Sequence, residues 1–487
     1  MPIKNIIARD NELKVLNQVW NSKDPEFIAI YGRRRVGKTF LIREYFSEKD
    51  AVYFELSGEK DASLASQLEN FVEIFSKVFF GGLLLRTPKS WKEAFALITQ
   101  EIEKLPKSKK VILFFDELPW LASKKSGALQ ALDYYWNRHW SKYANVKMIV
   151  CGSAASWMLE KLINAKGGLY NRLTRTILLK PYTLKGTKEY LQSRGIPLTP
   201  KQVLDLYMVF GGIPHYLKQI EKGKSSTQLI NKICFQSDGL LYNEFDRLFT
   251  SLFEHSEDSL AIVTAIASQR HGLTRDELIR KTRFSSGGTL NKRLGELESS
   301  GLIQSYIPYG HKKKELYFRL IDEYCYFYLS WIQPLKSKGI EGGKSYWQTK
   351  SKTPSAITWA GYTFETICLK HVDQIRDALD LQAVSCEVGS WQHVAKRGSK
   401  DLGAQIDLLF DRDDGVITLC DMKYSERPFS VDKECAKNLK RKLEVFEAHF
   451  ITKKQFYFAI ITTAGLKPTI WSEDLIQSEV TLDDLMR

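Results

Sequence analysis

The stretch FIAIYGRRRVGKTF, residues 27–40, decides the fold of the N-terminal part of the chain. Its apolar run Phe27–Tyr31 has the length of a buried strand, and a helical pattern begins after the following loop. Between the two, Gly32 to Thr39 match the spacing Gly-x-x-x-x-Gly-Lys-Ser/Thr. Glycines at these positions let the backbone curl so that its N–H groups face a phosphate at a helix N-terminus. The stretch therefore predicts a phosphate-binding loop.

The side chains of this loop suit a nucleoside triphosphate. Lys38 offers a point charge to the β- and γ-phosphates, and the hydroxyl of Thr39 can bind Mg²⁺. We expect ATP with Mg²⁺ as the cofactor. For the three arginines of the loop, solvated surface charge is the alternative. The residues predicted to contact the nucleotide are Gly32, Arg33, Arg34, Arg35, Val36, Gly37, Lys38, Thr39 and Phe40.

A second part of the same site follows another apolar run. Val111–Phe115 (VILFF) leads directly into Asp116 and Glu117. A carboxylate at the C-terminal end of a buried strand can hold Mg²⁺, so Asp116 joins Thr39 as a predicted metal ligand. Glu117 would polarise the attacking water. Together with the loop, this pair predicts an enzyme, a P-loop ATPase.

Two further residues could belong to the nucleotide site, and each also has a purely structural alternative. Ser153 follows the strand pattern Val146–Cys151 and could sense the γ-phosphate, or cap the next helix. Arg172 is a predicted catalytic arginine finger, with Arg175 as a second choice. The alternative for both arginines is surface charge.

Local patterns divide the chain into regions. Alternating strand and helix patterns predict an α/β fold with a parallel sheet at the N-terminus. Three short helical patterns followed by two strands have the order of a winged helix-turn-helix, and Gly, Ser and Lys make residues 336–354 a predicted linker. The expected regions are a P-loop ATPase core (1–180), a helical lid (181–256), a winged helix with its bridging helix (257–335) and a C-terminal α/β domain (355–487).

In the predicted winged helix, Lys292 and Arg293 would lie on the recognition helix and His311–Lys314 would form the wing. Packing of this module against other parts of the chain is the alternative to direct DNA reading.

Composition and charge narrow the class of partner. Hydrophobic residues make up 44% and charged residues 26%, which is ordinary globular usage and excludes a disordered or collagenous chain. Lys and Arg exceed Asp and Glu by 71 − 57 = 14, which favours a polyanionic partner, either nucleic acid or an anionic membrane. Among nucleic acids we expect DNA first. A homo-oligomer is left open.

Other sequence features predict the compartment. The apolar run Tyr324–Ile332 has half the ~20 residues of a membrane span, so no membrane partner is expected. Seven scattered cysteines without a CxxC pair, and no signal sequence, predict a cytoplasmic protein.

The C-terminal region contains a second group of acids. AQIDLLFDRDDGVITLCDMKY, residues 404–424, predicts a β-hairpin. A turn centred on Asp414 places Asp407 opposite Asp421, and Gln405 opposite Lys423. Like charges across a ladder are destabilising, and Mg²⁺ or Mn²⁺ between the two carboxylates would compensate. Two acids that hold a metal and a lysine are the ingredients of phosphodiester hydrolysis. Solvated acids beside a turn are the alternative.

The order of motifs in the N-terminal half resembles the archaeal-type ATPases, a STAND/AAA+-like branch. The motifs are IARDNELKVL, GRRRVGKT, FFDELPWL, CGSAASWM, LYNRLTRTILLKPYTL and GGIPHYL. The resemblance implies that GGIP couples the nucleotide site to the winged helix, which adds Pro214 to the nucleotide-site residues. Asn171 stands where the resemblance leads us to expect glycine.

The rest of the chain also resembles this group. YFRLIDEYCYFYLSWIQP is similar to its bridge between winged helix and C-terminal domain. The C-terminal region resembles the DUF234-type, restriction-endonuclease-like domain with a PD-(D/E)xK pattern. This resemblance implies that Asp421-Met422-Lys423 is the DxK motif and that Glu365 is its upstream acid.

The leading hypothesis is an ATP-dependent or ATP-gated DNA nuclease, by family analogy in defence or mobile-element control. One alternative is an ATP-switched DNA-binding regulator with an inactive nuclease fold, and another is a signalling scaffold with a protein partner. Divalent-dependent cleavage distinguishes the first hypothesis, and salt-sensitive DNA binding without cleavage distinguishes the second.

Overall fold

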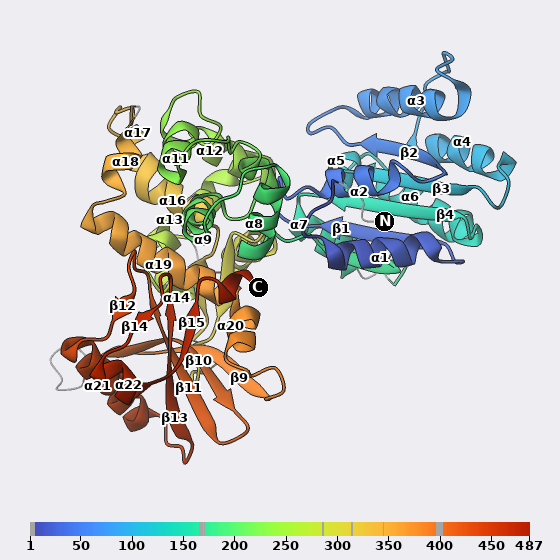
Figure 1. Cartoon of the computed structure of the whole chain (residues 1–487). Helices are drawn as coiled ribbons and strands as arrows, with labels where there is room; N and C mark the ends of the chain where they lie inside the picture. Colours follow the sequence, from blue (N-terminus) through green and yellow to red (C-terminus); the bar gives the residue numbers. More distant parts are fainter. Residues whose placement is uncertain are drawn as a thin grey trace. The chain divides into compact units, whose positions relative to one another are not determined.

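The structure is a computed structural model that describes residues 5–164, 169, 171–284, 287–312, 315–343, 345–395 and 403–487. The chain forms two compact units, which we describe separately (Figure 1). The first unit consists of the residues up to Pro181 with the short segments Thr250–Glu254 and Gly295–Gly301, and the second consists of the remainder.

A five-stranded parallel sheet forms the centre of the first unit. Its order is β2-β3-β4-β1-β5, so β4 lies between the strand that enters the loop and the strand that ends in the acids. The strands are β1 (Glu26–Tyr31), β2 (Ala51–Ser57), β3 (Lys110–Asp116), β4 (Val146–Gly152) and β5 (Arg175–Leu178). The sequence patterns correctly predict β1, β3 and β4, whose residues are almost wholly buried. They miss β2 and β5, the two edge strands, which are more exposed.

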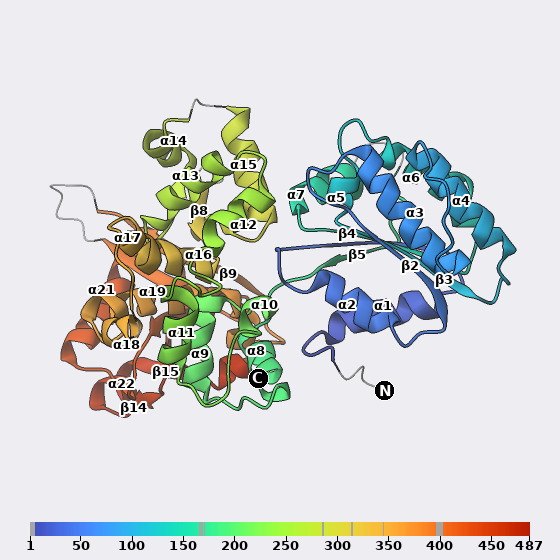
Figure 2. The ribbon, with the colours of Figure 1, turned by 90° about the horizontal axis from the view of Figure 1, so that it is seen from above.

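Helices cover both faces of this sheet. Figure 2 shows α1 and α2 on one face and α3, α4 and α6 on the other. Ser63 and Ser90 begin α3 and α4 as N-caps, each accepting a hydrogen bond from the backbone three residues on. The helices are α1 (Asp10–Asn21), α2 (Lys38–Phe46), α3 (Leu64–Phe80), α4 (Trp91–Lys104), α5 (Leu118–Leu121), α6 (Ala128–Arg138) and α7 (Ala155–Met158).

Helices follow as predicted from Tyr182 onward. The GGIP segment ends one helix and begins another: Gly211 has φ 61° at the C-cap of α9, and Pro214 is the first residue of α10. Gly212 cannot be replaced easily, because a Cβ on it would lie 2.1 Å from the carbonyl oxygen of Tyr182. The helices are α8 (Leu184–Ser193), α9 (Pro200–Phe210), α10 (Pro214–Leu217), α11 (Ser226–Phe235) and α12 (Glu244–Leu252).

The next segment contains three helices and a small antiparallel sheet of order β6-β8-β7. All three helices and the two longer strands are elements that the sequence predicts, and Lys313 and Lys314 of the predicted wing lie outside the described residues. Arg293 is only 5% exposed and pairs with Asp258 at 3.4 Å, so the prediction that it reads DNA is wrong. The elements are α13 (Ser256–Ala267), β6 (Leu273–Thr274), α14 (Arg275–Thr282), α15 (Gly288–Ser299), β7 (Ile303–Tyr306) and β8 (Tyr317–Leu320).

Residues 336–354 are more than the predicted linker. They contain α18 (Tyr346–Lys350), whose Trp347 is buried against Phe235, Phe327 and Trp331. The apolar run before them forms buried helical turns, α16 (Glu323–Phe327), a π-helical turn (Tyr328–Ile332) and α17 (Gln333–Lys336). Within the described ranges, no helix is both long and apolar enough to cross a membrane.

The C-terminal sheet is mixed, with order β15-β13-β11-β10-β9. Strands β9, β10 and β11 are antiparallel neighbours, while β13 and β15 add in parallel. Helix α19 packs against β11, and α21 packs against β10. The elements are α19 (Pro354–Lys370), α20 (Val372–Ala378), β9 (Cys386–His393), β10 (Ala404–Arg412), β11 (Val416–Lys423), β12 (Phe429–Ser430), α21 (Lys433–His449), β13 (Gln455–Thr462), β14 (Leu466–Lys467), α22 (Ile470–Leu475) and β15 (Ile476–Thr481).

A buried histidine joins two parts of the second unit. His371 Nε2 accepts a hydrogen bond from the backbone N–H of Leu184 at 3.0 Å, and Nδ1 lies 2.8 Å from the carbonyl oxygen of Ile367. Burial lowers the pKa of His371 from 6.5 to about 4, because the imidazolium would lose water and could no longer accept from Leu184.

This shift predicts acid sensitivity of the second unit. Above pH 6.5 His371 is neutral in both the folded and the unfolded chain. As pH falls toward 4, the unfolded chain gains a proton that the folded chain does not, which costs about 3 kcal/mol of stability. A His371→Gln variant should be less stable at pH 7 but should lose less stability on acidification, so the two unfolding free energies converge. Urea unfolding between pH 7 and 4 measures this, and parallel pH profiles for the two proteins would contradict it.

Candidate functional site

The predicted phosphate-binding loop connects β1 to α2 in a conformation that needs its glycines. Gly32 has φ 142° and Gly37 has φ 94°, both in the range that favours glycine. A Cβ on Gly32 would lie 2.3 Å from the carbonyl oxygen of Leu179, which forbids a side chain there. Because α2 begins at Lys38, its first N–H groups lie at the end of the loop, where they suit an anion.

Two cations hold this loop in shape. The ammonium of Lys38 donates to the carbonyl oxygens of Gly32 at 3.0 Å and Arg33 at 3.1 Å. Arg9 donates to Val36 at 3.2 Å and to Lys180 at 2.8 Å, so it links the N-terminal segment to the loop. Arg9 lies in the motif IARDNELKVL, but no local pattern predicts its contact with the loop.

Thr39 and Asp116, the predicted Mg²⁺ ligands, are in direct contact. The Thr39 hydroxyl donates to Asp116 Oδ2 at 2.7 Å, and Asp116 Oδ1 accepts from the N–H of Glu117 at 3.1 Å. A hydroxyl and a carboxylate are hard oxygen ligands of the kind that Mg²⁺ accepts together with phosphate and water. The donor set therefore suits Mg²⁺ carried by a nucleotide.

Glu117 is held in a fixed position at the end of β3. Its φ of 45° is in the left-handed region, which is rare for a residue with a side chain and is concentrated at functional sites. Its carboxylate accepts from both the N–H of Ser153 at 3.0 Å and the Ser153 hydroxyl at 2.9 Å. The alternative role of Ser153 as a helix cap is wrong, because Ala154 stands at the N-cap position of α7 with no side-chain cap, and the Ser153 hydroxyl donates to Glu117.

The other predicted nucleotide-site residues differ in their surroundings. Arg33 is only 3% exposed, so a solvated surface charge is wrong for it, while Arg34 and Arg35 are half-buried. Phe40 is 50% exposed on α2, and Val36 is buried. Pro214 lies in the second unit, and its part in nucleotide binding stays a prediction.

Arg172 lies exposed in the turn before β5, after Asn171 with φ 57°. Asparagine tolerates this left-handed conformation better than most residues, which explains how it can stand where glycine is expected. Arg175 is also exposed and donates to the carbonyl oxygen of Thr174 at 2.9 Å. The finger role stays a prediction for both arginines.

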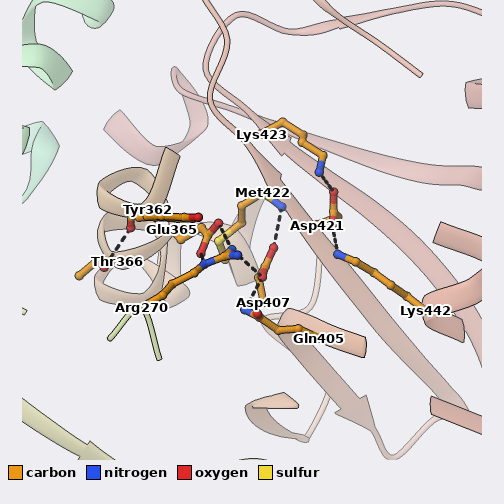
Figure 3. Close-up of polar contacts among 10 residues, drawn as sticks. All are labelled: Arg270, Tyr362, Glu365, Thr366, Gln405, Asp407, Asp421, Met422, Lys423 and Lys442. Carbon is orange, nitrogen blue, oxygen red and sulfur yellow. Dashed lines mark hydrogen bonds and ion pairs between the residues drawn. The ribbon is translucent and has the colours of Figure 1, made fainter. Parts of the chain in front are cut away.

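The second group of predicted site residues borders one pocket of the second unit. Glu365 comes from α19, Asp407 from β10, and Asp421 and Lys423 from β11 (Figure 3). Two further cations, Arg270 and Lys442, border the same pocket without a signal in the sequence, and Gln405 contacts Asp407 rather than facing Lys423. Only Gln405 has a signal in the sequence, because it alternates with Asp407 along β10.

The predicted hairpin register is confirmed from Leu408 to Asp411, but the ladder ends before the predicted pairs Asp407–Asp421 and Gln405–Lys423. Leu408 pairs with Cys420 and Asp411 with Ile417, as a turn centred on Asp414 requires. The pairing of β10 with β9 shifts between Ile406 and Leu409, so the strand is irregular at Asp407. Instead of facing Asp421 in the ladder, Asp407 accepts from the N–H of Met422 at 3.4 Å.

Two lysines neutralise Asp421. Lys423 Nζ lies 2.6 Å from its Oδ2, and Lys442 Nζ lies 2.5 Å from its Oδ1. Burial alone would raise the pKa of Asp421, but the charges of Lys442 and Lys423 outweigh burial and lower it. Asp421 is therefore an ionised carboxylate.

Asp407 has the opposite environment. It is 7% exposed and accepts from the amide of Gln405 at 2.9 Å. Burial, followed by the charges of Glu365 and Asp421, raises the pKa of Asp407 from 3.8 to about 7. Glu365 in turn pairs with Arg270 at 2.5 Å.

The donor chemistry of this pocket suits Mg²⁺ or Mn²⁺, since carboxylate oxygens are their preferred protein ligands. The arrangement does not yet form a metal site: within the described ranges, no group of three or more His, Cys, Asp or Glu side chains is placed to hold an ion. The side chains of Arg270, Lys423 and Lys442 occupy the oxygens that an ion would need.

The sheet of the first unit, with its loop and acids at the carboxyl ends of β1 and β3, defines a P-loop ATPase. Residues 6–220 match a family described as an ATPase domain predominantly from Archaea. This part of the chain is accordingly an ATPase domain of the archaeal type, which confirms the resemblance for the N-terminal region.

Three other similarities accompany this match. An uncharacterized protein of Methanocaldococcus jannaschii is 26% identical over 458 residues, covering 93% of this chain and 95% of that protein. A Walker-type ATPase of Pyrococcus abyssi is 19% identical, with a TM-score of 0.47, and the match covers 66% of this chain and 96% of that one. The ORC2 protein of Aeropyrum pernix is 15% identical, with a TM-score of 0.44, covering 69% and 96%.

The nucleotide site predicts that ATP binding and ATP hydrolysis can be impaired separately by substitution. Lys38→Ala should weaken ATP binding at least about tenfold, because it removes a charge-assisted contact to phosphate. Glu117→Gln should keep ATP binding and slow hydrolysis by about 100-fold or more, as expected for loss of a general base. Ser153→Ala should slow hydrolysis less, since it removes only one of the two hydrogen bonds that position the Glu117 carboxylate.

Binding of a fluorescent ATP analogue and phosphate release measure the two functions. Lys14→Ala, an exposed lysine on α1, is the matched control. Unchanged ATP affinity in Lys38→Ala would rule out the assigned loop.

Proposed function

We propose that this chain couples an ATP-hydrolysing domain to a metal-dependent DNA nuclease domain. The observation that carries the proposal is the pocket of the second unit, where Glu365, Asp407, Asp421 and Lys423 come together from one helix and two adjacent strands. Acids that can hold a divalent ion beside a lysine form the minimal equipment for metal-assisted phosphodiester hydrolysis.

The order of elements around the pocket supports this proposal. Helix α19, the strands β9, β10 and β11, helix α21 and strand β13 follow in the order of a restriction-endonuclease-like core. In it, Asp421-Met422-Lys423 stands as the DxK motif at the end of β11. We regard residues 355–487 as the nuclease-like domain.

Each side chain has a role in the proposed reaction. Asp407 and Asp421, assisted by Glu365, would hold Mg²⁺ or Mn²⁺, which when bound polarises the phosphate and activates water. Gln405 orients Asp407 through its amide. Lys423 and Lys442 keep Asp421 ionised, and once its oxygens turn to an ion they are available to stabilise negative charge on the phosphate.

The substrate we propose is a polyanion, DNA in the first place. The pocket is bordered by Lys423, Arg441 and Lys442 as well as by its acids, and the whole chain carries a charge of +14. Arg441 donates to the carbonyl oxygen of Gly403 at 2.5 Å, which fixes this cation at the rim. Such a rim attracts phosphates that the acids alone would repel.

The remaining regions complete the proposal. Residues 181–256 act as a helical lid with GGIP, and residues 257–335 act as a winged helix with its bridge, from which Lys292 is exposed toward a DNA partner. ATP binding gates access of DNA to the pocket. In a homo-oligomer, Arg172 completes an ATP site. The protein works in the cytoplasm in defence or mobile-element control.

One observation favours the alternative of an ATP-switched DNA-binding regulator with an inactive nuclease fold. Within the described part of the chain, the acids are paired with cations and no three of them are placed to hold a metal. That protein would bind DNA without cleaving it.

The nuclease proposal predicts separable losses. Asp407→Asn and Lys423→Ala should each reduce Mg²⁺- or Mn²⁺-dependent DNA cleavage to background, while ATP hydrolysis stays at the wild-type rate. Asp413→Asn, an exposed acid in the turn of the same hairpin, is the matched control and should cleave normally. Cleavage that persists in Asp407→Asn would reject the proposed nuclease site. If the wild-type protein binds DNA but does not cleave it, the alternative of an ATP-switched DNA-binding regulator is favoured.

The charge predicts salt-sensitive DNA binding. Affinity should fall at least about tenfold between ~50 and ~200 mM salt, because bound cations are released from phosphates. Lys292→Ala should reduce both the affinity for DNA and the dependence of that affinity on salt. Arg293 is not substituted, because it is buried. Fluorescence anisotropy with labelled DNA measures both quantities, and salt-independent binding or no binding would favour the scaffold with a protein partner.

A further inference from the structure

We propose that Arg270 is an internal plug of the carboxylate pocket, which occupies the place of a divalent ion and must withdraw before an ion can bind. The inference rests on the proposed function, because it concerns the regulation of the same pocket. Arg270 belongs to neither the hairpin nor the helix that carries the acids. It lies in the loop between α13 and β6, in the segment we propose to be a winged helix.

The guanidinium of Arg270 contacts two of the three acids (Figure 3). Its Nη2 lies 2.5 Å from Glu365 Oε1, and its Nε donates to Glu365 Oε2 at 3.3 Å, so both oxygens of this carboxylate are engaged. The same Nη2 lies 3.9 Å from Asp407 Oδ1. A cation that bridges Glu365 and Asp407 in this way stands where the proposed ion would need the same oxygens.

Packing holds Arg270 in this position. Its guanidinium lies over the ring of Tyr362, 4.4 Å from the centroid, and Tyr362 precedes Glu365 by three residues on α19. The loop is anchored on its other side, since the Tyr306 hydroxyl donates to the carbonyl oxygen of His271 at 2.7 Å. Gly272 has φ 78°, and a Cβ on it would lie 2.0 Å from the carbonyl oxygen of Phe318. The loop is therefore fitted to β7 and β8.

Electrostatics make Arg270 and a divalent ion mutually exclusive. A guanidinium within a few ångströms of a dication is repelled by it, and both cations need the same carboxylate oxygens. The third acid, Asp421, is likewise occupied by Lys423 and Lys442, so each acid of the pocket faces a cation or another acid. An occupied pocket of this kind agrees with the finding that, in the described ranges, no three acids are placed for a metal.

The position of Arg270 in the chain indicates what would withdraw it from the pocket. Because its loop is anchored to β7 and β8, a shift of this segment moves Arg270 relative to α19 and β10. The side chain is 34% exposed, so it can leave toward solvent without crossing the core. Loading of the pocket with metal is thereby tied to the state of the segment that carries the plug.

Mn²⁺ titration calorimetry on the full chain without nucleotide tests the plug. Arg270→Gln should bind Mn²⁺ at least about tenfold more tightly than wild type, and the gain should disappear in Arg270→Gln combined with Asp407→Asn. Arg270→Lys retains the positive charge and should stay closer to wild type. Arg280→Gln, an exposed arginine on α14, is the control for loss of one positive charge. Thermal unfolding verifies that each variant is folded.

The outcomes separate the plug from the proposed function. If Arg270→Gln binds Mn²⁺ no more tightly than wild type, while wild-type cleavage depends on Asp407, the plug is wrong and the nuclease stands. Reduced cleavage in Arg270→Gln at saturating Mn²⁺, with unchanged Mn²⁺ affinity, would make Arg270 a substrate-binding residue and also overturn the plug. If neither wild type nor any Arg270 variant binds Mn²⁺ or cleaves DNA, both proposals fail together.

Discussion

The need of a buried charge for a polar or oppositely charged partner shapes both candidate sites of this chain. Asp421 is buried and ionised because two lysines lie within hydrogen-bonding distance, and Glu365 is satisfied by Arg270. In the ATPase domain the relation is reversed, since Lys38 is a buried cation held by loop carbonyl oxygens. In each arrangement the buried charge has partners from the chain itself.

Local sequence patterns predict the parts of the fold in which neighbouring residues decide the structure. The loop after β1, the acids after β3 and the β10–β11 register all follow from spacing within a few residues. The edge strands β2 and β5 are missed because half-exposed strands lack a continuous apolar run. Asp407 departs from the ladder through an irregularity that depends on β9, which no local pattern encodes.

Residues that act across long sequence separations could not be found in this way. Arg270 and Lys442 lie 95 and 21 positions from the acids they contact, and neither belongs to a motif. Arg293 illustrates the converse, because its place on a predicted recognition helix suggests exposure while its partner Asp258 holds it inside. A charged residue in a basic chain can thus be exposed, line a pocket or lie in the core, and only tertiary packing decides which.

The aromatic packing of Trp347 has a consequence for how the second unit can be altered or inherited. Its backbone N–H donates to the side chain of Asn231 at 2.8 Å, and its ring stacks on Phe235, so residues on α11 and α18 depend on each other. A graft that exchanged the C-terminal region between relatives at residues 336–354 would separate Trp347 from these partners. In a recombinant protein that is to fold, α11 and the C-terminal region must therefore come from the same parent.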